Sequence, residues 1–162
     1  MHNTFTQSWW LTEGADTLDP LNATVAMKTT AGDDTFRAPA NNFLASTDYI
    51  DGGAGNDTLV ASVTAAGQTL APVLKNIENI TLTIAATNEK TTTFNAVDTT
   101  GATTISIKDA GAVGATYTTL VSDERITVSN LAKTTTLGII GGTESPRVSW
   151  RPVGLSQADT AA

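Results

Sequence analysis

The residues best suited to chemistry lie in the stretch GGAGNDTLV, Gly52 to Val60. Glycines at positions 52, 53 and 55 allow positive φ, which turns the backbone carbonyl oxygens inward. Asp57 adds a carboxylate where the chain leaves this turn, and Leu59 then begins a short strand that faces a core. Ca²⁺ accepts roughly six to eight oxygen ligands in irregular geometries, and carbonyls with a few carboxylates supply them. The stretch therefore predicts a calcium-binding turn.

Two shorter copies of this stretch come before it. EGADTLD (residues 13–19) and AGDDTFR (31–37) share the pattern G-x-D-T-[L/F] with AGNDTLV (54–60). Gly14 and Gly32 are separated by the length of two nonapeptides. Alternate turns stack in a roll of such repeats, so we expect Asp16 and Asp34 to face each other across an ion.

Acidic residues are concentrated in the first third of the chain. Residues 1–60 contain eight acids and two bases, so they hold −6 of the net charge of −7. Two carboxylates about 4 Å apart repel by roughly 4 kcal/mol at an effective dielectric near 20, which favours a neutralising cation. The longer step from Gly32 to Gly55 contains an insertion that carries Asp48 and Asp51 toward the third copy. Three acidic β-turns without an ion remain the alternative, since Asp, Asn and Gly dominate turns.

Composition argues against several other kinds of site. The chain has no Cys, and its one His is residue 2, so thiolate and paired-histidine metal sites are excluded and a Ser-His-Asp triad is disfavoured. Clusters of Lys and Arg that could bind phosphates are missing, so nucleic acid is not an expected partner. No apolar run is long enough for a transmembrane helix, and we expect no membrane insertion. No phosphate loop, nucleophile elbow or paired-carboxylate site is present, so we expect no enzymatic activity.

A family resemblance rests on TAGDDTF, DYIDGGAGNDTLV and LKNIENITLT, within residues 12–140. The chain resembles the RTX-type calcium-binding repeat proteins of bacterial surfaces, both S-layer subunits and large adhesins. The resemblance implies a parallel β-roll or β-helix, an extracellular location and type I secretion. It maps calcium ligands to Asp34, Asp51, Asp57 and the carbonyls around Gly32, Gly53 and Gly55. Together with Asp16 and Asp48 these are the candidate metal ligands, and we expect at most two well-formed ion sites.

The rest of the chain predicts strands at regular intervals. Thr accounts for 31 of 162 residues, and a β-branched residue suits a pleated surface. Apolar and polar residues alternate in ITLTI (80–84), TISI (104–107), RITVS (125–129) and TLGII (136–140). The segment from Leu70 to Ile80 predicts a short helix or loop that enters a strand, with Pro72 favouring the loop. Large apolar residues recur every 11 or 12 positions, at Leu59, Leu70, Leu82, Phe94, Ile105, Tyr117, Val128, Ile139 and Trp150.

This spacing predicts an all-β fold. One strand and one turn in each such interval fit the half-coils of a parallel β-roll or β-helix-like solenoid, or alternatively a β-sandwich. We expect two regions: an acidic Gly/Asp calcium-binding block over residues 1–60, and a Thr-rich β-repeat region over 61–162. The second region should continue the first and be truncated at the C-terminus. SWW near the N-terminus is expected to cover part of the first coil.

These features favour a non-catalytic, calcium-stabilised structural module of a secreted bacterial cell-surface protein. Its expected partners are calcium ions and other surface components, including further copies of itself. The N-terminus lacks a basic segment followed by an apolar one, so export without a Sec signal peptide is expected. An accessory calcium-binding repeat domain of a secreted hydrolase is the alternative, and a catalytic signature in flanking sequence would distinguish it.

Overall fold

The computed structural model describes residues 5–22, 24, 27–40, 43–63, 69–84, 91–109, 125–131, 134–140 and 147–152. The described residues form fourteen β-strands and no α-helix, and the paired strands are parallel. Within this part of the chain there is no apolar helix long enough to cross a membrane. The expected all-β parallel solenoid is therefore confirmed, and the sandwich alternative is excluded.

The strands form three sheets. The first sheet contains β1 (Ser8–Trp10), β3 (Thr35–Ala38), β5 (Thr58–Val63), β8 (Asn79–Ile84), β11 (Thr104–Asp109) and β13 (Thr136–Ile140), in that order. The second contains β2 (Thr17–Leu18), β4 (Tyr49–Asp51), β7 (Val73–Lys75) and β10 (Thr99–Thr100). The third contains β6 (Thr69–Leu70), β9 (Thr91–Asn95), β12 (Arg125–Leu131) and β14 (Arg147–Pro152).

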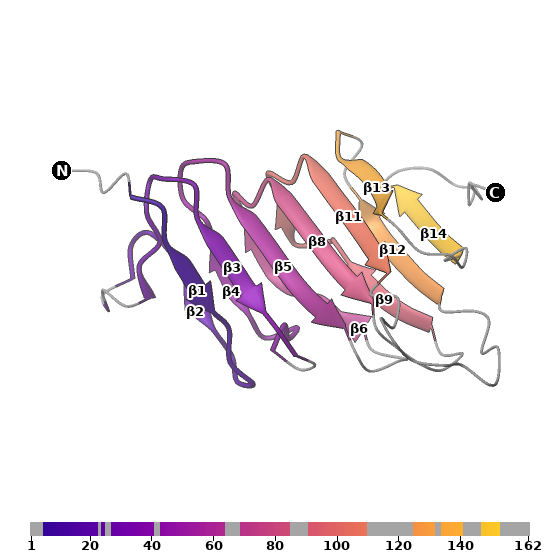
Figure 1. The fold of residues 1–162 in the computed structure, drawn as a ribbon, viewed down its shortest axis with the longest axis horizontal. Coiled ribbons are helices and arrows are strands. Elements are labelled where there is room, and N and C mark those ends of the chain that lie inside the picture. The colour runs from indigo at the N-terminus through magenta and orange to yellow at the C-terminus, as the bar shows by residue number, and fades with distance from the viewer. Residues whose placement is uncertain are drawn as a thin grey trace.

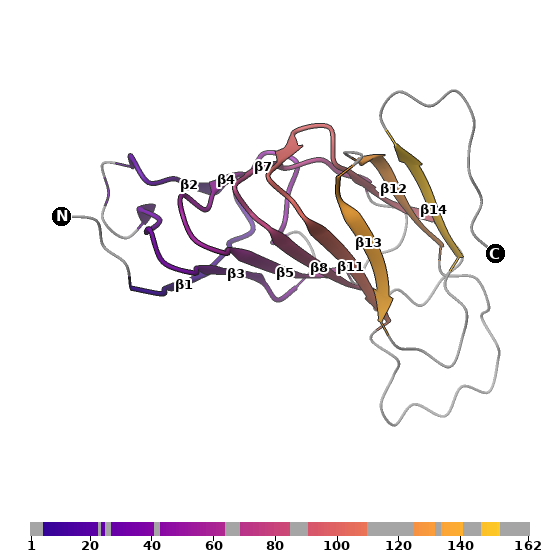
Figure 2. The same ribbon diagram turned by 90° about the horizontal axis from the view of Figure 1, so that it is seen from above.

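The chain winds so that each strand lies beside the strand one coil later. The first sheet forms one side of the stack, and the second and third sheets form the other (Figures 1 and 2). Coil length varies along the stack. In the first sheet, the step between paired residues is shortest from Thr58 to Asn79 and longest from Thr104 to Thr136.

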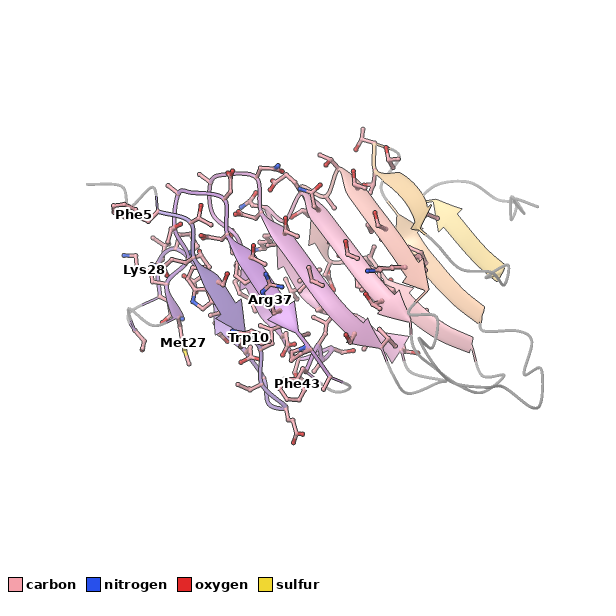
Figure 3. All side chains as sticks on the ribbon, viewed as in Figure 1. Phe5, Trp10, Met27, Lys28, Arg37 and Phe43 are labelled. Atoms are coloured by element: carbon pink, nitrogen blue, oxygen red, sulfur yellow. The ribbon has the colours of Figure 1, made fainter. Side chains whose placement is uncertain are left out.

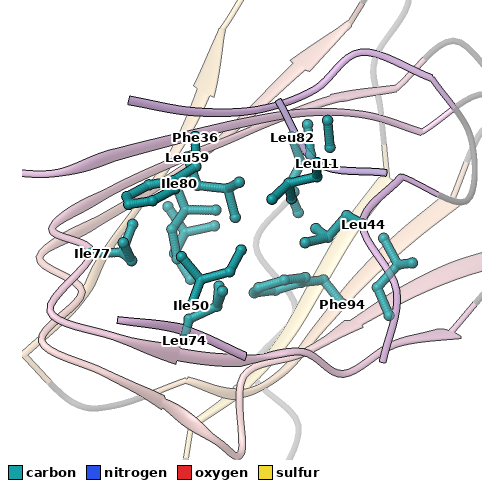
Figure 4. Close-up of a cluster of buried hydrophobic side chains, with 14 of the residues drawn as sticks. Leu11, Phe36, Leu44, Ile50, Leu59, Leu74, Ile77, Ile80, Leu82 and Phe94 are labelled. Carbon is teal, nitrogen blue, oxygen red and sulfur yellow. The ribbon is translucent and has the colours of Figure 1, made fainter. Parts of the chain in front are cut away.

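The core lies between the two sides and follows from strand alternation. In β5, Leu59, Ala61 and Val63 are buried while the residues between them are half-buried. Leu59 pairs with Ile80, and Ile80 pairs with Ile105, so each apolar side chain stacks on its equivalent in the next coil. Figure 4 shows this cluster filling the space between the sheets. Burial of each such side chain contributes about 1.5–3 kcal/mol, and stacking makes each coil depend on its neighbours.

The apolar spacing of the sequence has a direct structural meaning. Leu70, Phe94, Val128 and Trp150 occupy one register position in the third sheet. Strands of the first sheet contain Leu59, Leu82, Ile105 and Ile139. The apolar period thus marks alternation between the two sides of the solenoid. The alternation breaks after Ile105. The period assigns the next position beside Phe94 in the third sheet to Tyr117, which lies outside the described residues. In the structure Val128 pairs with Phe94 instead.

The predicted strands and the segment from Leu70 to Ile80 can be compared with the structure. The four predicted strands coincide with β8, β11, β12 and β13. The segment from Leu70 to Ile80 was expected to be a short helix or loop that enters a strand. It does enter the strand β8, but it also contains the strand β7, which the sequence did not predict. Pro72 does not prevent this, since the strand begins one residue later, where the Val73 N–H donates to the Asp48 carbonyl at 2.9 Å.

Candidate functional site

Three of the acidic residues stack at the entrance to the first sheet. Asp34, Asp57 and Glu78 each stand just before a strand, namely β3, β5 and β8. The backbone confirms their equivalence, because the Thr58 N–H donates to the Asp34 carbonyl and the Asn79 N–H donates to the Asp57 carbonyl. We call Asp34, Asp57 and Glu78 the carboxylate ladder.

Each carboxylate of the ladder accepts a backbone N–H from the preceding coil. The Gln7 N–H donates to Asp34 Oδ1 at 2.9 Å. The Asp34 N–H donates to Asp57 Oδ1 at 2.7 Å, and the Asp57 N–H donates to Glu78 Oε2 at 2.7 Å. Hydrogen bonds to a charged acceptor are short and strong, so the ladder ties successive coils together. The sequence pattern does not single out Glu78 as a member of this ladder; its position directly before β8 is the signal that could have identified it.

A second pair of acids stands at the entrance to the second sheet. The Asp16 N–H donates to Asp48 Oδ1 at 3.0 Å, and the Ala45 N–H donates to Asp48 Oδ2 at 2.7 Å. Asp48 is buried, and this desolvation raises the pKa of its carboxyl despite the two N–H bonds that lower it. The acids of this pair precede β2 and β4, which are neighbours in the second sheet.

The predicted pairing of Asp16 with Asp34 is wrong. Asp16 stacks with Asp48, whereas Asp34 stacks with Asp57 at a different sheet. The reason is the length of the coil. Ser8 of β1 pairs with Thr35 of β3, so one coil contains more residues than two nonapeptides do. The insertion does bring Asp48 into the acidic region, but beside Asp16.

A threonine satisfies the carboxylate in the first two copies of the motif. The Thr12 N–H donates to Asp16 Oδ2 at 2.8 Å, and the Thr30 N–H donates to Asp34 Oδ2 at 2.8 Å. The Thr30 hydroxyl also lies 2.8 Å from Asp34 Oδ1. In the third copy Gly53 holds the equivalent position before its Asp. The N–H of Gly53 instead donates to Asp51 Oδ1 at 3.0 Å.

Asp57 differs from Asp16, Asp34 and Asp48, whose two carboxylate oxygens all accept hydrogen bonds. Its side chain is fully buried, and Oδ2 has no hydrogen-bond partner within the described part of the chain. Desolvation raises the pKa of Asp57 to about 7, although the Asp34 N–H lowers it; the carboxylates of Asp34, Glu78 and Asp33 raise it further. A buried acceptor without a partner is unfavourable, and an ionised one more so. Among the described residues, Asp57 is therefore the carboxylate with a buried oxygen available to a cation or a proton.

The glycines of the third copy allow coils to approach closely. Gly53 and Gly55 have φ of 91° and 135°, as the sequence predicts for both. A Cβ on Gly53 would lie 2.6 Å from the Thr30 carbonyl oxygen, and one on Gly55 would lie 2.5 Å from the Gly32 carbonyl oxygen. Gly52 does not have positive φ, contrary to the prediction; a Cβ there would overlap the side chain of the motif aspartate.

Asp51 is the last residue of β4, directly before this turn. Its Oδ1 accepts the Gly53 N–H and also the Asn76 Nδ2–H, the latter at 2.8 Å. Among the residues that the structure describes, no three His, Cys, Asp or Glu side chains form a group that could hold a metal ion. A cation at this turn would therefore take most of its ligands from backbone carbonyls and water, with Asp57 as the carboxylate.

No protein-family model, no curated protein and no solved structure matches this chain.

Proposed function

We propose that the chain is a non-catalytic structural module of a secreted bacterial cell-surface protein, S-layer-like or adhesin-like, and that calcium stabilises its folded form. The fold supports a structural role, because a β-solenoid is a regular stack whose coils are held by repeated contacts. Its acids serve the stack itself, since the carboxylate ladder uses its oxygens to accept backbone N–H groups of neighbouring coils.

One observation carries the calcium part of the proposal: the buried Oδ2 of Asp57, which has no hydrogen-bond partner within the described residues. This atom lies in the one motif copy with an intact G-G-x-G-x-D pattern. A Cβ on Gly52 would meet both this atom and the Asn76 carbonyl oxygen, so both oxygens lie beside the Gly52 backbone. The Thr29 hydroxyl, beside Gly53, is likewise buried and without a partner in the described residues. Hard oxygens of these kinds suit Ca²⁺.

The donor set fits a weak site better than a strong one. Both oxygens of Asp34 accept hydrogen bonds, from Gln7 and from Thr30. Asp48 is occupied in the same way. With one buried carboxylate oxygen left without a partner among the described residues, an ion would be held in the class of extracellular modules, with Kd on the order of 10⁻⁴ to 10⁻³ M. Such a site is empty inside a cell and filled outside, where binding to the folded state alone stabilises it.

Calcium-coupled folding also suits the proposed export route. Without the ion, the carboxylates of Asp34, Asp57 and Glu78 repel one another in adjacent coils. The acidic third then loses stability, and an unfolded chain can pass through a type I channel. In millimolar external calcium the same region would fold and stabilise the coils stacked on it.

Calcium titration of the melting temperature tests the proposal. We expect Ca²⁺ to raise the Tm of the wild type and to leave Asp57→Asn unchanged, because Asn keeps the bond from the Asp34 N–H but removes the charge. Asp98→Asn is the matched control: it removes an equal charge from an exposed residue and should respond to calcium as the wild type does. A wild-type Tm that is indifferent to millimolar calcium would refute the calcium part of the proposal.

A further inference from the structure

The three motif copies differ in the acceptor that one backbone N–H group uses. In the first two copies, the threonine four residues before the motif aspartate donates its N–H to that aspartate. Gly53 holds the same position in the third copy, but its N–H donates to Asp51 Oδ1 at 3.0 Å. Asp57 Oδ2 therefore receives no N–H from its own turn, and it has no other hydrogen-bond partner among the described residues.

The third copy alone has an acceptor at the place of Asp51. The equivalent place before the motif aspartate is held by Trp10 in the first copy and by Lys28 in the second. Indole and ammonium groups donate hydrogen bonds and do not accept them. Both side chains are exposed, and Figure 3 shows Lys28 extending outward at the N-terminal end of the stack. A carboxylate at this place accepts the N–H of the second residue after it, in an Asx turn.

The same oxygen of Asp51 also holds the neighbouring coil. Asp51 Oδ1 accepts the Asn76 Nδ2–H at 2.8 Å. Asn76 has a φ of 51°, a left-handed conformation that Asn tolerates, and its N–H donates to the Thr100 carbonyl at 3.0 Å. The Asn76 carbonyl oxygen and Asp57 Oδ2 both lie beside the Gly52 backbone. Asp51 therefore fixes the residue whose carbonyl lies near the buried Asp57 oxygen.

We propose that Asp51 is a positioning residue that opens the third motif copy to a cation. It takes the Gly53 N–H away from Asp57, and it holds Asn76 so that a carbonyl oxygen stands near Asp57 Oδ2. Its own Oδ1 is occupied by two donors, so it acts through these neighbours rather than as a ligand.

The same comparison assigns the opposite role to the threonines of the first two copies. Thr12 and Thr30 satisfy their aspartates with both the N–H and the hydroxyl, which closes these copies to an ion. A single Ca²⁺ is then bound at the motif copies, at the third one. This inference rests on the proposed calcium site, and it adds which copy binds the ion and which residues select it.

Calorimetric titration with calcium chloride tests the role of Asp51 through a conservative variant. In Asp51→Ala both donors are released, and the calcium affinity should fall by about tenfold or more. In Asp51→Asn an amide oxygen can still accept both donors, so only the effect of a lost charge should remain. Asp33→Asn is the control for that effect, because the Asp33 carboxylate also faces Asp57 and its Oδ1 accepts the Asn56 N–H.

The expected order of affinities is the wild type first, Asp51→Asn equal to Asp33→Asn, and Asp51→Ala weakest. If Asp51→Asn loses as much affinity as Asp51→Ala, the charge of Asp51 binds the ion directly and the positioning role is refuted. Urea unfolding without calcium measures the structural cost of each variant. A merely structural Asp51 would lower that free energy of unfolding and leave the calcium affinity of the folded protein unchanged, which would also refute the proposal.

Two further results separate this inference from the proposed function. A wild type that binds no calcium refutes both. If the wild type binds calcium and Asp57→Asn does not, while Asp51→Ala binds as the wild type does, the calcium site stands and the role of Asp51 is refuted. Calcium binding that survives in Asp57→Asn and is lost in Asp34→Asn would refute the closure of the second copy by its threonine. Circular dichroism identical to that of the wild type identifies the folded variants for these comparisons.

Discussion

Replacing Asp57 with Asn should change how the stability of this protein depends on pH. Burial raises the pKa of Asp57 to about 7 in the folded state, from an ordinary value of 3.8. The folded state therefore binds this proton more tightly than the unfolded state does. Between pH 4 and pH 7 the unfolded chain loses the proton first, so this group lowers the free energy of unfolding as pH rises. Above pH 7 the destabilisation is complete.

The size of the effect follows from the shift. The full shift corresponds to about 4 kcal/mol, at about 1.4 kcal/mol per pKa unit. The turn around Asp57 is exposed at Ala54, Gly55 and Asn56, where solvent screens charge, so we expect roughly half of this value, ~2 kcal/mol. In Asp57→Asn the contribution is absent. From pH 4 to pH 8 the wild type should therefore lose ~2 kcal/mol of unfolding free energy relative to Asp57→Asn.

Urea unfolding in the presence of a chelator is the suitable assay. Trp9 is buried and stacked on Phe36, with ring centroids 5.4 Å apart, so its fluorescence reports on the first coils. Measuring both proteins at each pH cancels the contributions of the other carboxylates. Parallel stability curves for the two proteins would show that Asp57 carries no unfavourable buried charge, and the reasoning about Oδ2 would then fail.

Two further predictions concern the motif copies. Gly55→Ala should destabilise the fold by about 1–3 kcal/mol in thermal melts, because φ is 135° and the new Cβ would meet the Gly32 carbonyl of the preceding coil. Gly14→Ala is the control and should be nearly neutral, because the nearest atom to its Cβ, the Thr12 hydroxyl oxygen, would be 3.8 Å away. Thr30→Val should lower the free energy of unfolding by about 1–3 kcal/mol, since the buried Thr30 hydroxyl bonds to Asp34. Thr12→Val removes the equivalent, exposed hydroxyl and should lower it clearly less, as measured by urea unfolding. Equal losses in the two variants would argue against burial as the cause.

The general architecture could be predicted because it depends on strand alternation. Apolar residues at every second position indicated the strands β8, β11, β12 and β13. The apolar period indicated two sides, and Leu70, Phe94 and Val128 indeed share one register position. These signals are local, and a stack of coils repeats them.

The pairing of the acids could not be predicted in the same way. Which acids meet depends on the length of each coil, and the steps along the first sheet differ from one coil to the next. A constant repeat of two nonapeptides therefore assigned Asp34 to Asp16 rather than to Asp57. The length of each loop is set by its own turns, and no strand pattern reports it.

The role of threonine was also missed. A hydroxyl residue in place of a motif glycine looks like a degenerate copy in sequence. In the structure Thr30 satisfies Asp34, whereas Gly53 leaves Asp57 without that partner. The copy with the intact glycines is thus the one whose carboxylate has an oxygen to spare.

A crystal structure of the chain grown with millimolar calcium tests the central claim most directly. Our account predicts a calcium ion about 2.3–2.6 Å from Asp57 Oδ2, completed by backbone carbonyls and water. An Asp57 carboxylate that contacts only protein or water, with no ion at the turn under those conditions, would contradict it.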